Sequence, residues 1–117
     1  MYAHPVYAHP ILPLHDHAPS LTAYQLGRDA TRAAFCLLNR NDFESAAAEF
    51  RRAAAAAEVI AANLHERAHQ HKAGSAECRL LVERCHRWAD IAVVRGEYAT
   101  QCQALAELAD ALAAVAS

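Results

Sequence analysis

Alanine occupies 30 of the 117 positions of this chain, and no proline follows Pro19. Alanine has the highest helix propensity of any residue but adds little area to a core. Phenylalanine, tyrosine and tryptophan together make up only 7% of the residues, a composition that favours helices packed at short range over a sheet. We therefore expect an all-α fold in a single domain.

The first two expected helices are separated at Asn41. Ser20 is a suitable N-cap for a helix that runs to about Arg40. Asn41, followed three residues later by Glu44, resembles a capping box. It is therefore expected to open a second helix, which continues to about Lys72.

Two glycines mark the remaining expected breaks. Gly74 followed by Ser75 supplies a C-terminal stop and a new N-cap. Gly96 then divides the rest of the chain into a third helix and a fourth that fills residues 97–117. Short connections between long amphipathic helices make sequential helices antiparallel neighbours. The sequence therefore predicts an antiparallel up-down four-helix bundle, built from two helical hairpins, over residues 20–117.

Each expected helix carries an apolar stripe in steps of three and four residues, the spacing that lines one face of a helix. In the second helix the stripe comprises Phe43, Ala47, Phe50, Ala54, Ala57, Ala61, Leu64, Ala68 and His71. The third helix contributes Cys78, Leu81, Cys85, Trp88 and Ala92, and the fourth contributes Tyr98, Cys102, Leu105, Ala109, Leu112 and Ala116. We expect these stripes to face the core.

The first nineteen residues have a different composition. Tyr-Ala-His-Pro occurs twice in succession, and prolines at positions 5, 10, 13 and 19 oppose a helix and favour extended geometry at the residues before them. Four of the eight histidines lie in this segment. We expect an extended Pro/His-rich arm over residues 1–19, either a tail that packs on the domain or an arm that binds a metal or a partner.

Small and aromatic residues recur around the first connection, namely Ala30, Ala33, Ala34, Leu37, Asn41-Asp42-Phe43, Ala46, Phe50 and Ala53. Over residues 30–54 this pattern resembles one helical hairpin of the tetratricopeptide family. That family repeats at about 34 residues, whereas Gly96-Glu97-Tyr98 echoes the first connection at a distance of 55 residues, and no closing proline is present. The resemblance implies a helical scaffold for protein interaction.

His65 begins the sequence His-Glu-Arg-Ala-His, which matches the zinc-peptidase pattern H-E-x-x-H. On a helix the two histidines of this pattern lie one turn apart, so that both can bind one ion. The stripe through Leu64 and Ala68 turns His65 and Glu66 toward solvent, and Arg67 places a cation beside the expected ion, which is unfavourable. We therefore expect no peptidase activity and no catalytic residues.

A non-catalytic metal site is the alternative use of these histidines. In a hairpin that turns at the second connection, His69 lies at about the level of Cys78, since each residue rises about 1.5 Å along its helix. His65, His69 and Cys78 are therefore predicted to converge on one ion. Glu77 or His71 would be a further ligand. Imidazole and thiolate ligands suit zinc, copper or nickel. The competing interpretation places the four cysteines in the core as small apolar residues.

The charge balance excludes some classes of partner. Ten arginines and one lysine oppose thirteen acidic residues, so the formal net charge is −2, and no dense basic run is available for a nucleic acid. Charged residues interrupt every long alanine stretch, so no window reaches the roughly 18 apolar residues of a membrane span. No lysine or arginine precedes Arg28, unlike in a secretory signal. We expect a cytoplasmic protein with reduced cysteines and neither a nucleic-acid nor a membrane partner.

These observations favour a small non-enzymatic protein-interaction or assembly module, whose partner is another protein or a second copy of the chain. Alanine-lined helices with a modest core gain stability from self-association, so we expect a homodimer. The alternative function is a transition-metal-binding protein that uses histidine and cysteine ligands near the second connection.

Overall fold

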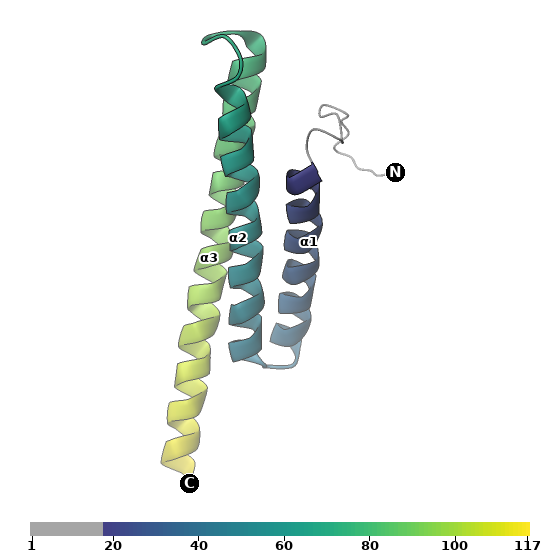
Figure 1. Ribbon diagram of the computed structural model, residues 1–117. Coiled ribbons are helices and arrows are strands. Elements are labelled where there is room, and N and C mark those ends of the chain that lie inside the picture. Colours follow the sequence, from purple (N-terminus) through teal and green to yellow (C-terminus); the bar gives the residue numbers. More distant parts are fainter. Residues whose placement is uncertain (1–17) are drawn as a thin grey trace.

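The computed structural model describes residues 18–117 and shows three long helices (Figure 1). They are α1 (Ala18–Asn39), α2 (Phe43–Ala68) and α3 (Ala76–Ala116). α1 and α3 run in one direction, α2 runs in the other, and α2 packs against both of its neighbours. The all-α prediction is confirmed. The arm expected over residues 1–19 lies outside the described residues, apart from its last two, which open α1.

The predicted four-helix bundle is wrong, because the expected third and fourth helices form one helix of 41 residues. Gly96 lies inside α3, where Thr100 donates a side-chain hydrogen bond of 3.1 Å to its carbonyl oxygen. A glycine inside a helix costs only about 1 kcal/mol relative to alanine, and no cap residue or proline follows Gly96 to stop the helix. The break expected near Gly74 is present: α2 ends before it, at Ala68, Gly74 adopts a φ of 82° in the connection, and Ser75 caps α3.

The first connection is shifted by one residue from the expected capping box. Asp42, and not Asn41, is the N-cap of α2: its Oδ1 accepts a hydrogen bond of 3.2 Å from the backbone N–H of Ser45. Asn41 instead adopts a left-handed φ of 60°, a conformation that asparagine tolerates better than most residues. The turn between α1 and α2 therefore depends on both residues of the Asn-Asp pair.

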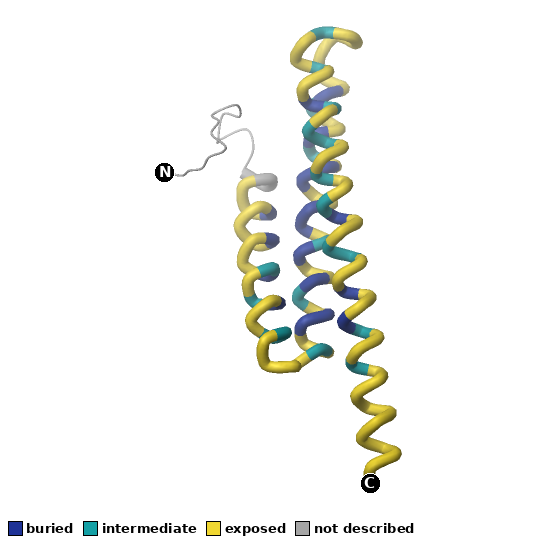
Figure 2. Tube along the Cα trace, turned by 180° about the vertical axis from the view of Figure 1, so that it is seen from behind, coloured by how far each residue is buried: buried dark blue, intermediate teal, exposed yellow. Residues whose placement is uncertain are grey.

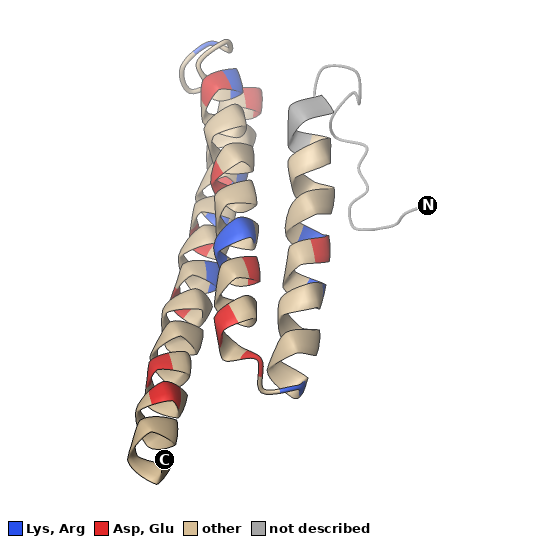
Figure 3. Ribbon diagram, turned by 60° about the horizontal axis from the view of Figure 1, so that its bottom comes forward, with Lys and Arg blue, Asp and Glu red and all other residues tan. Residues whose placement is uncertain are grey.

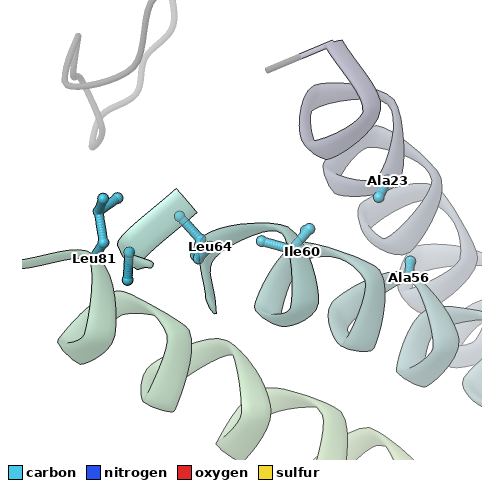
Figure 4. Packing of buried hydrophobic residues seen from close by; sticks show 6 residues of the cluster. Ala23, Ala56, Ile60, Leu64 and Leu81 are labelled. Atoms are coloured by element: carbon cyan, nitrogen blue, oxygen red, sulfur yellow. The ribbon is translucent and has the colours of Figure 1, made fainter. Parts of the chain in front are cut away.

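The core consists of two clusters along α2. One joins Ala23 of α1, the α2 residues Ala56, Ile60, Leu64 and Ala68, and Leu81 of α3 (Figure 4). The other surrounds Phe50, which with Leu64 is the largest side chain that is completely buried. Alanine occupies most of the remaining buried positions, so the helices approach closely. The predicted stripe of α2 is largely confirmed, since six of its nine residues are buried.

α3 extends beyond the end of the hairpin that α1 and α2 form (Figure 1). At about 1.5 Å per residue, its length is about 60 Å. Cys102 is its last buried residue, and Figure 2 shows the end that follows as exposed. We call residues 104–116 the overhang. In spite of this length, no helix in the described part of the chain combines the extent and the hydropathy needed to cross a bilayer.

Candidate functional site: the histidine pair and the exposed face of α3

His65 and His69 lie one turn apart at the C-terminal end of α2, which stops at Ala68 rather than near the expected Lys72. Their Nε2 atoms are 3.0 Å apart and their rings meet edge to face, with centroids 4.4 Å apart. Both side chains are exposed, as is Glu66 between them. Two nitrogen ligands of a tetrahedral zinc ion, each about 2.0–2.1 Å from the metal, would be about 3.3 Å apart. The pair is therefore close to the separation that two ligands of one ion require.

The other predicted ligands do not join this pair. Within residues 18–117, no three His, Cys, Asp or Glu side chains are grouped so that they could hold a metal ion. Cys78 is half-buried and packs against the core cluster that contains Leu81, while Glu77 and His71 are exposed. Of the predicted ligand set, the structure brings together His65 and His69 alone.

A half-buried arginine joins all three helices. Arg95 of α3 reaches α2, where its Nη1 donates a hydrogen bond of 3.0 Å to the carbonyl oxygen of Ala53. Its guanidinium carbon lies 6.0 Å from the centroid of the Trp88 ring, and the group also contacts Gly27 of α1. Burial lowers the pKa of Arg95, and Tyr24 acts in the opposite direction. Arginine keeps its proton in proteins, so Arg95 is a structural cation and not a general base.

Aromatic side chains connect α1 to α3 across the edge of α2. Tyr24 meets Trp88 with ring centroids 6.0 Å apart, and Phe35 meets Tyr98 at the same distance. Tyr98 also stacks on the buried Phe50 at 5.2 Å. These pairs bring side chains of α1 and α3 together at corresponding levels, although α2 separates the two helix backbones, and they form the sides of a shallow surface.

A groove of about 300 Å³ runs along this surface between α1 and α3, and its floor and walls are almost entirely apolar. It is lined by Thr31, Phe35, Phe50, Asp90, Ile91, Val94, Arg95 and Tyr98. Phe35 is 45% exposed in spite of its aromatic contacts. A large apolar side chain that remains half open in a groove marks a surface that another apolar group can cover.

α3 carries two parallel apolar seams. The first seam faces α2 and comprises Leu81, Cys85, Trp88, Ala92, Arg95, Ala99 and Cys102. The second seam comprises Ile91, Val94, Tyr98, Gln101, Leu105, Leu108, Leu112 and Val115. Both alternate steps of three and four residues, which is the repeat of helices that pair along their length. The second is displaced by one residue from the first, and it is therefore rotated about 100° around the helix.

The second seam is open to solvent from Val94 to Val115. Its exposed fraction is 41% at Tyr98 and rises to 62% at Leu112 and 84% at Val115. Ile91 is half-buried beside α1, and Gln101 is the single polar member. The seam begins in the groove between α1 and α3 and continues without interruption along the overhang.

The sequence predicts that part of this seam lies in the core, and that prediction is wrong. Of the six-residue stripe expected after Gly96, Cys102 alone is buried, whereas Tyr98, Leu105 and Leu112 are exposed. The expected stripe lay between the two seams and mixed members of both. The expected break at Gly96 concealed the second seam, because its repeat becomes visible only when Ile91 and Val94 are counted in the same helix as the overhang.

All four cysteines are free thiols. The interpretation that places them in the core is confirmed for Cys102, which is buried, and wrong for Cys36, which is exposed. Burial raises the pKa of the Cys102 thiol, so this side chain is not a prepared nucleophile.

Comparisons of the chain with known protein families, curated proteins and solved structures found no match. The tetratricopeptide resemblance over residues 30–54 covers the end of α1, the connection and the first half of α2, and it has no support beyond those residues.

Proposed function

We propose that this chain is a small non-enzymatic interaction module that binds a protein helix along the second seam of α3. The observation that carries the proposal is the exposure of a regular apolar seam, seven of whose eight members are apolar. Single exposed apolar residues are common on soluble proteins, but contiguous apolar stripes mark surfaces that bind a partner. The heptad repeat indicates that the partner is itself a helix.

The overhang carries the most exposed residues of the second seam. Eleven of its thirteen residues are apolar, and Leu105, Leu108 and Leu112 are between 43% and 62% exposed. Complete burial of one such side chain contributes roughly 1.5–3 kcal/mol. A helix that is apolar around most of its circumference is normally buried, so the overhang has much to gain from a neighbouring helix.

The charged side chains of the overhang lie outside the second seam. Its only ionisable side chains are the acidic Glu107 and Asp110 (Figure 3). Positions 107 and 110 fall on the side of the helix away from the seam, because neither belongs to its three-and-four repeat. A partner helix would therefore meet apolar side chains, and its affinity should depend only weakly on salt.

We place this module in the cytoplasm. The four free thiols support a reducing compartment, above all the exposed Cys36, which in an oxidising compartment would be open to pairing between chains.

Site-specific photo-crosslinking tests the proposed function. A photoreactive amino acid is placed at Leu108, on the second seam, and the chain is expressed in the cells that normally make it. We expect a discrete covalent adduct with a protein, identified by mass spectrometry of the crosslinked peptide.

The matched control carries the same photoreactive residue at Ala114, which lies on the same overhang but on the opposite side. We expect little or no adduct from this position. Equal yields from both positions, or no adduct from Leu108, would show that the second seam is not a docking surface.

A second candidate function, transition-metal binding, is favoured by the separation of 3.0 Å between the Nε2 atoms of His65 and His69. Two imidazoles one turn apart on a helix can chelate zinc, copper or nickel. The remaining ligands would then come from water or from another molecule.

Metal titration of the purified chain tests this candidate. We expect one equivalent of nickel or zinc to bind at pH 7.5, and binding to weaken by at least about tenfold in His69→Ala, because a chelate loses one of its two protein ligands. His86→Ala, which removes an exposed histidine elsewhere, serves as the control. Equal binding by all three proteins would exclude the pair as the site.

A further inference from the structure

We infer that the helix bound by the second seam is α3 of a second copy of this chain. The two helices lie antiparallel, so that each overhang fills the groove between α1 and α3 of the other copy. This inference rests on the proposed function and names its partner.

The second seam is complementary to itself when one copy is reversed. Its steps are three, four, three, four, three, four and three residues, the same from either end. One antiparallel register therefore brings all eight positions of one copy against all eight of the other. The opposed pairs in this register are Ile91 with Val115, Val94 with Leu112, Tyr98 with Leu108, and Gln101 with Leu105.

The two halves of the second seam have different surroundings. Only an antiparallel arrangement places the half on the overhang of one copy against the half beside the groove of the other. The half from Ile91 to Tyr98 forms one wall of the groove and is flanked by α1. The half from Leu105 to Val115 lies on the overhang, which α2 borders only at Ala104 and Glu107 and which is exposed from Glu107 onward. Antiparallel pairing places the slender overhang in the flanked groove. Parallel pairing would instead place groove against groove and bring two α1 helices to the same level.

The overhang also has a flank suited to contact with α1. Ala106, Ala109, Ala113 and Ala116 continue the register of the first seam past the end of α2. In the antiparallel pair this flank turns toward the side on which α1 of the other copy lies. Because interaxial distance depends on the side chains at the contact, methyl groups allow the overhang to approach the exposed Phe35.

The contact area is sufficient for a specific dimer. Twenty-five residues of seam extend about 37 Å along helices about 10 Å across, or about 400 Å² of projected contact. Counting both copies, the seam supplies about 800 Å² of the roughly 1,000 Å² that a biological interface needs, and the two contacts between an overhang and α1 would supply the remainder.

Gln101 is the one polar member of the seam, and it lies beside the centre of the pairing, opposite Leu105. The length and spacing of the seam set the register, because a shift of seven residues would leave two seam positions of each copy unpaired. No charged residue belongs to the seam, so no like charges oppose the pairing.

The mass of the purified full chain provides the first test. Sedimentation equilibrium should give twice the chain mass of 12.7 kDa. Leu112→Asp should raise the dimer dissociation constant by at least about 100-fold, because it places an unpaired charge in an apolar seam. Ala114→Asp adds the same charge to the other side of the overhang and should remain dimeric. Leu112 is 62% exposed, so circular dichroism should show both variants equally folded.

The orientation is tested by disulfide formation in a background in which Cys36, Cys78, Cys85 and Cys102 are replaced by serine or alanine. Ile91→Cys and Val115→Cys chains should form a covalent dimer when mixed under mild oxidation, and neither should do so alone. A covalent dimer from Val115→Cys alone would indicate parallel helices and overturn the inference.

The outcomes separate this inference from the proposed function. A wild-type chain that remains monomeric at 100 μM overturns self-association, and so does a dimer that Leu112→Asp leaves intact. If that monomeric chain still gives a position-specific adduct from Leu108 with a different protein, the proposed function stands and its partner is not a second copy. If Leu108 gives no adduct at all, both fail.

Discussion

The two halves of α3 are one continuous helix in two different surroundings. Up to Cys102 the first seam packs against α2, and it includes large side chains such as the buried Leu81 and the half-buried Trp88. Beyond Cys102 the same register contains only alanine, while the second seam keeps leucine and valine to the end. Large side chains are thus absent from the α2-facing seam beyond Cys102, and they continue only on the seam that we propose binds another helix.

The largest expected difference between the two halves appears when the same leucine truncation is made in each. Leu81 is 4% exposed and belongs to the core, whereas Leu112 is 62% exposed. Leu81→Ala should lower the free energy of unfolding by about 2–5 kcal/mol through lost burial and a cavity. Leu112→Ala should change the stability of the isolated chain by less than about 0.5 kcal/mol.

Urea unfolding at several protein concentrations measures both effects. The loss caused by Leu81→Ala should be independent of concentration, since its contacts lie within one chain. Any loss from Leu112→Ala should appear only as the concentration rises, because the stability of a dimer depends on mass action. A large, concentration-independent effect of Leu112→Ala would mean that the overhang packs on its own chain.

Alanine substitutions at two glycines that lie in helices should change stability by smaller amounts, and the two changes should have opposite signs. A Cβ on Gly27 would lie 2.8 Å from Arg95 Nη1 and 3.2 Å from the Cβ of Ala56. Arg95 cannot move away freely, because it is bonded to the carbonyl oxygen of Ala53. Overpacking costs about 1–3 kcal/mol against a gain in helix propensity of about 1 kcal/mol, so Gly27→Ala should be destabilising by about 1 kcal/mol.

Gly96→Ala is the matched substitution outside the crowded contact. A Cβ there would meet no other group within 4 Å, so alanine should stabilise the chain by about 0.5–1 kcal/mol through helix propensity alone. Thermal unfolding of both variants measures the difference. Destabilisation by Gly96→Ala would indicate that the helix bends or breaks at this residue in solution.

The helical class, the connection at Gly74 and the α2 stripe followed from local signals in the sequence. The helix propensity of alanine and the capping by the Gly74-Ser75 pair are local effects on the backbone. They can therefore be predicted without knowledge of contacts between residues that are distant in the sequence. Gly96 misled the prediction because a glycine weakens a helix without ending it, and the outcome depends on the good helix formers around it.

The histidine pair and the second seam were predictable to different degrees. The four-residue spacing of His65 and His69 brings the two side chains close together on any helix, and in the structure their Nε2 atoms are 3.0 Å apart. The position of Cys78 depends on how α2 and α3 pack, which the sequence specifies only through the seams. The second seam was not predicted because the break expected at Gly96 separated Ile91 and Val94 from the residues that follow. Leu105 was therefore assigned to a stripe that lies between the two seams.

The smallest expected difference is in the reactivity of two thiols, and it tests whether the packed part of α3 extends to Cys102. Cys102 is the last buried residue of α3, whereas Cys36 on α1 is exposed. At pH 7.5 a thiol reagent should label Cys36 at least about tenfold faster than Cys102, because burial limits access and disfavours the reactive thiolate. Comparable rates, resolved by peptide mass spectrometry, would place Cys102 in a frayed overhang.

The pH dependence of stability tests the same boundary. Burial raises the pKa of the Cys102 thiol above its ordinary value of 9.0. Above about pH 9 the unfolded chain therefore loses this proton while the folded chain retains it, and stability falls as the pH rises. Wild-type protein should lose stability between pH 8 and 10 faster than Cys102→Ala, by at most about 1.4 kcal/mol per pH unit. Urea unfolding of both proteins across this range measures the two slopes. Equal slopes would mean that the thiol is solvated in the folded chain and that the packed part of α3 ends before Cys102.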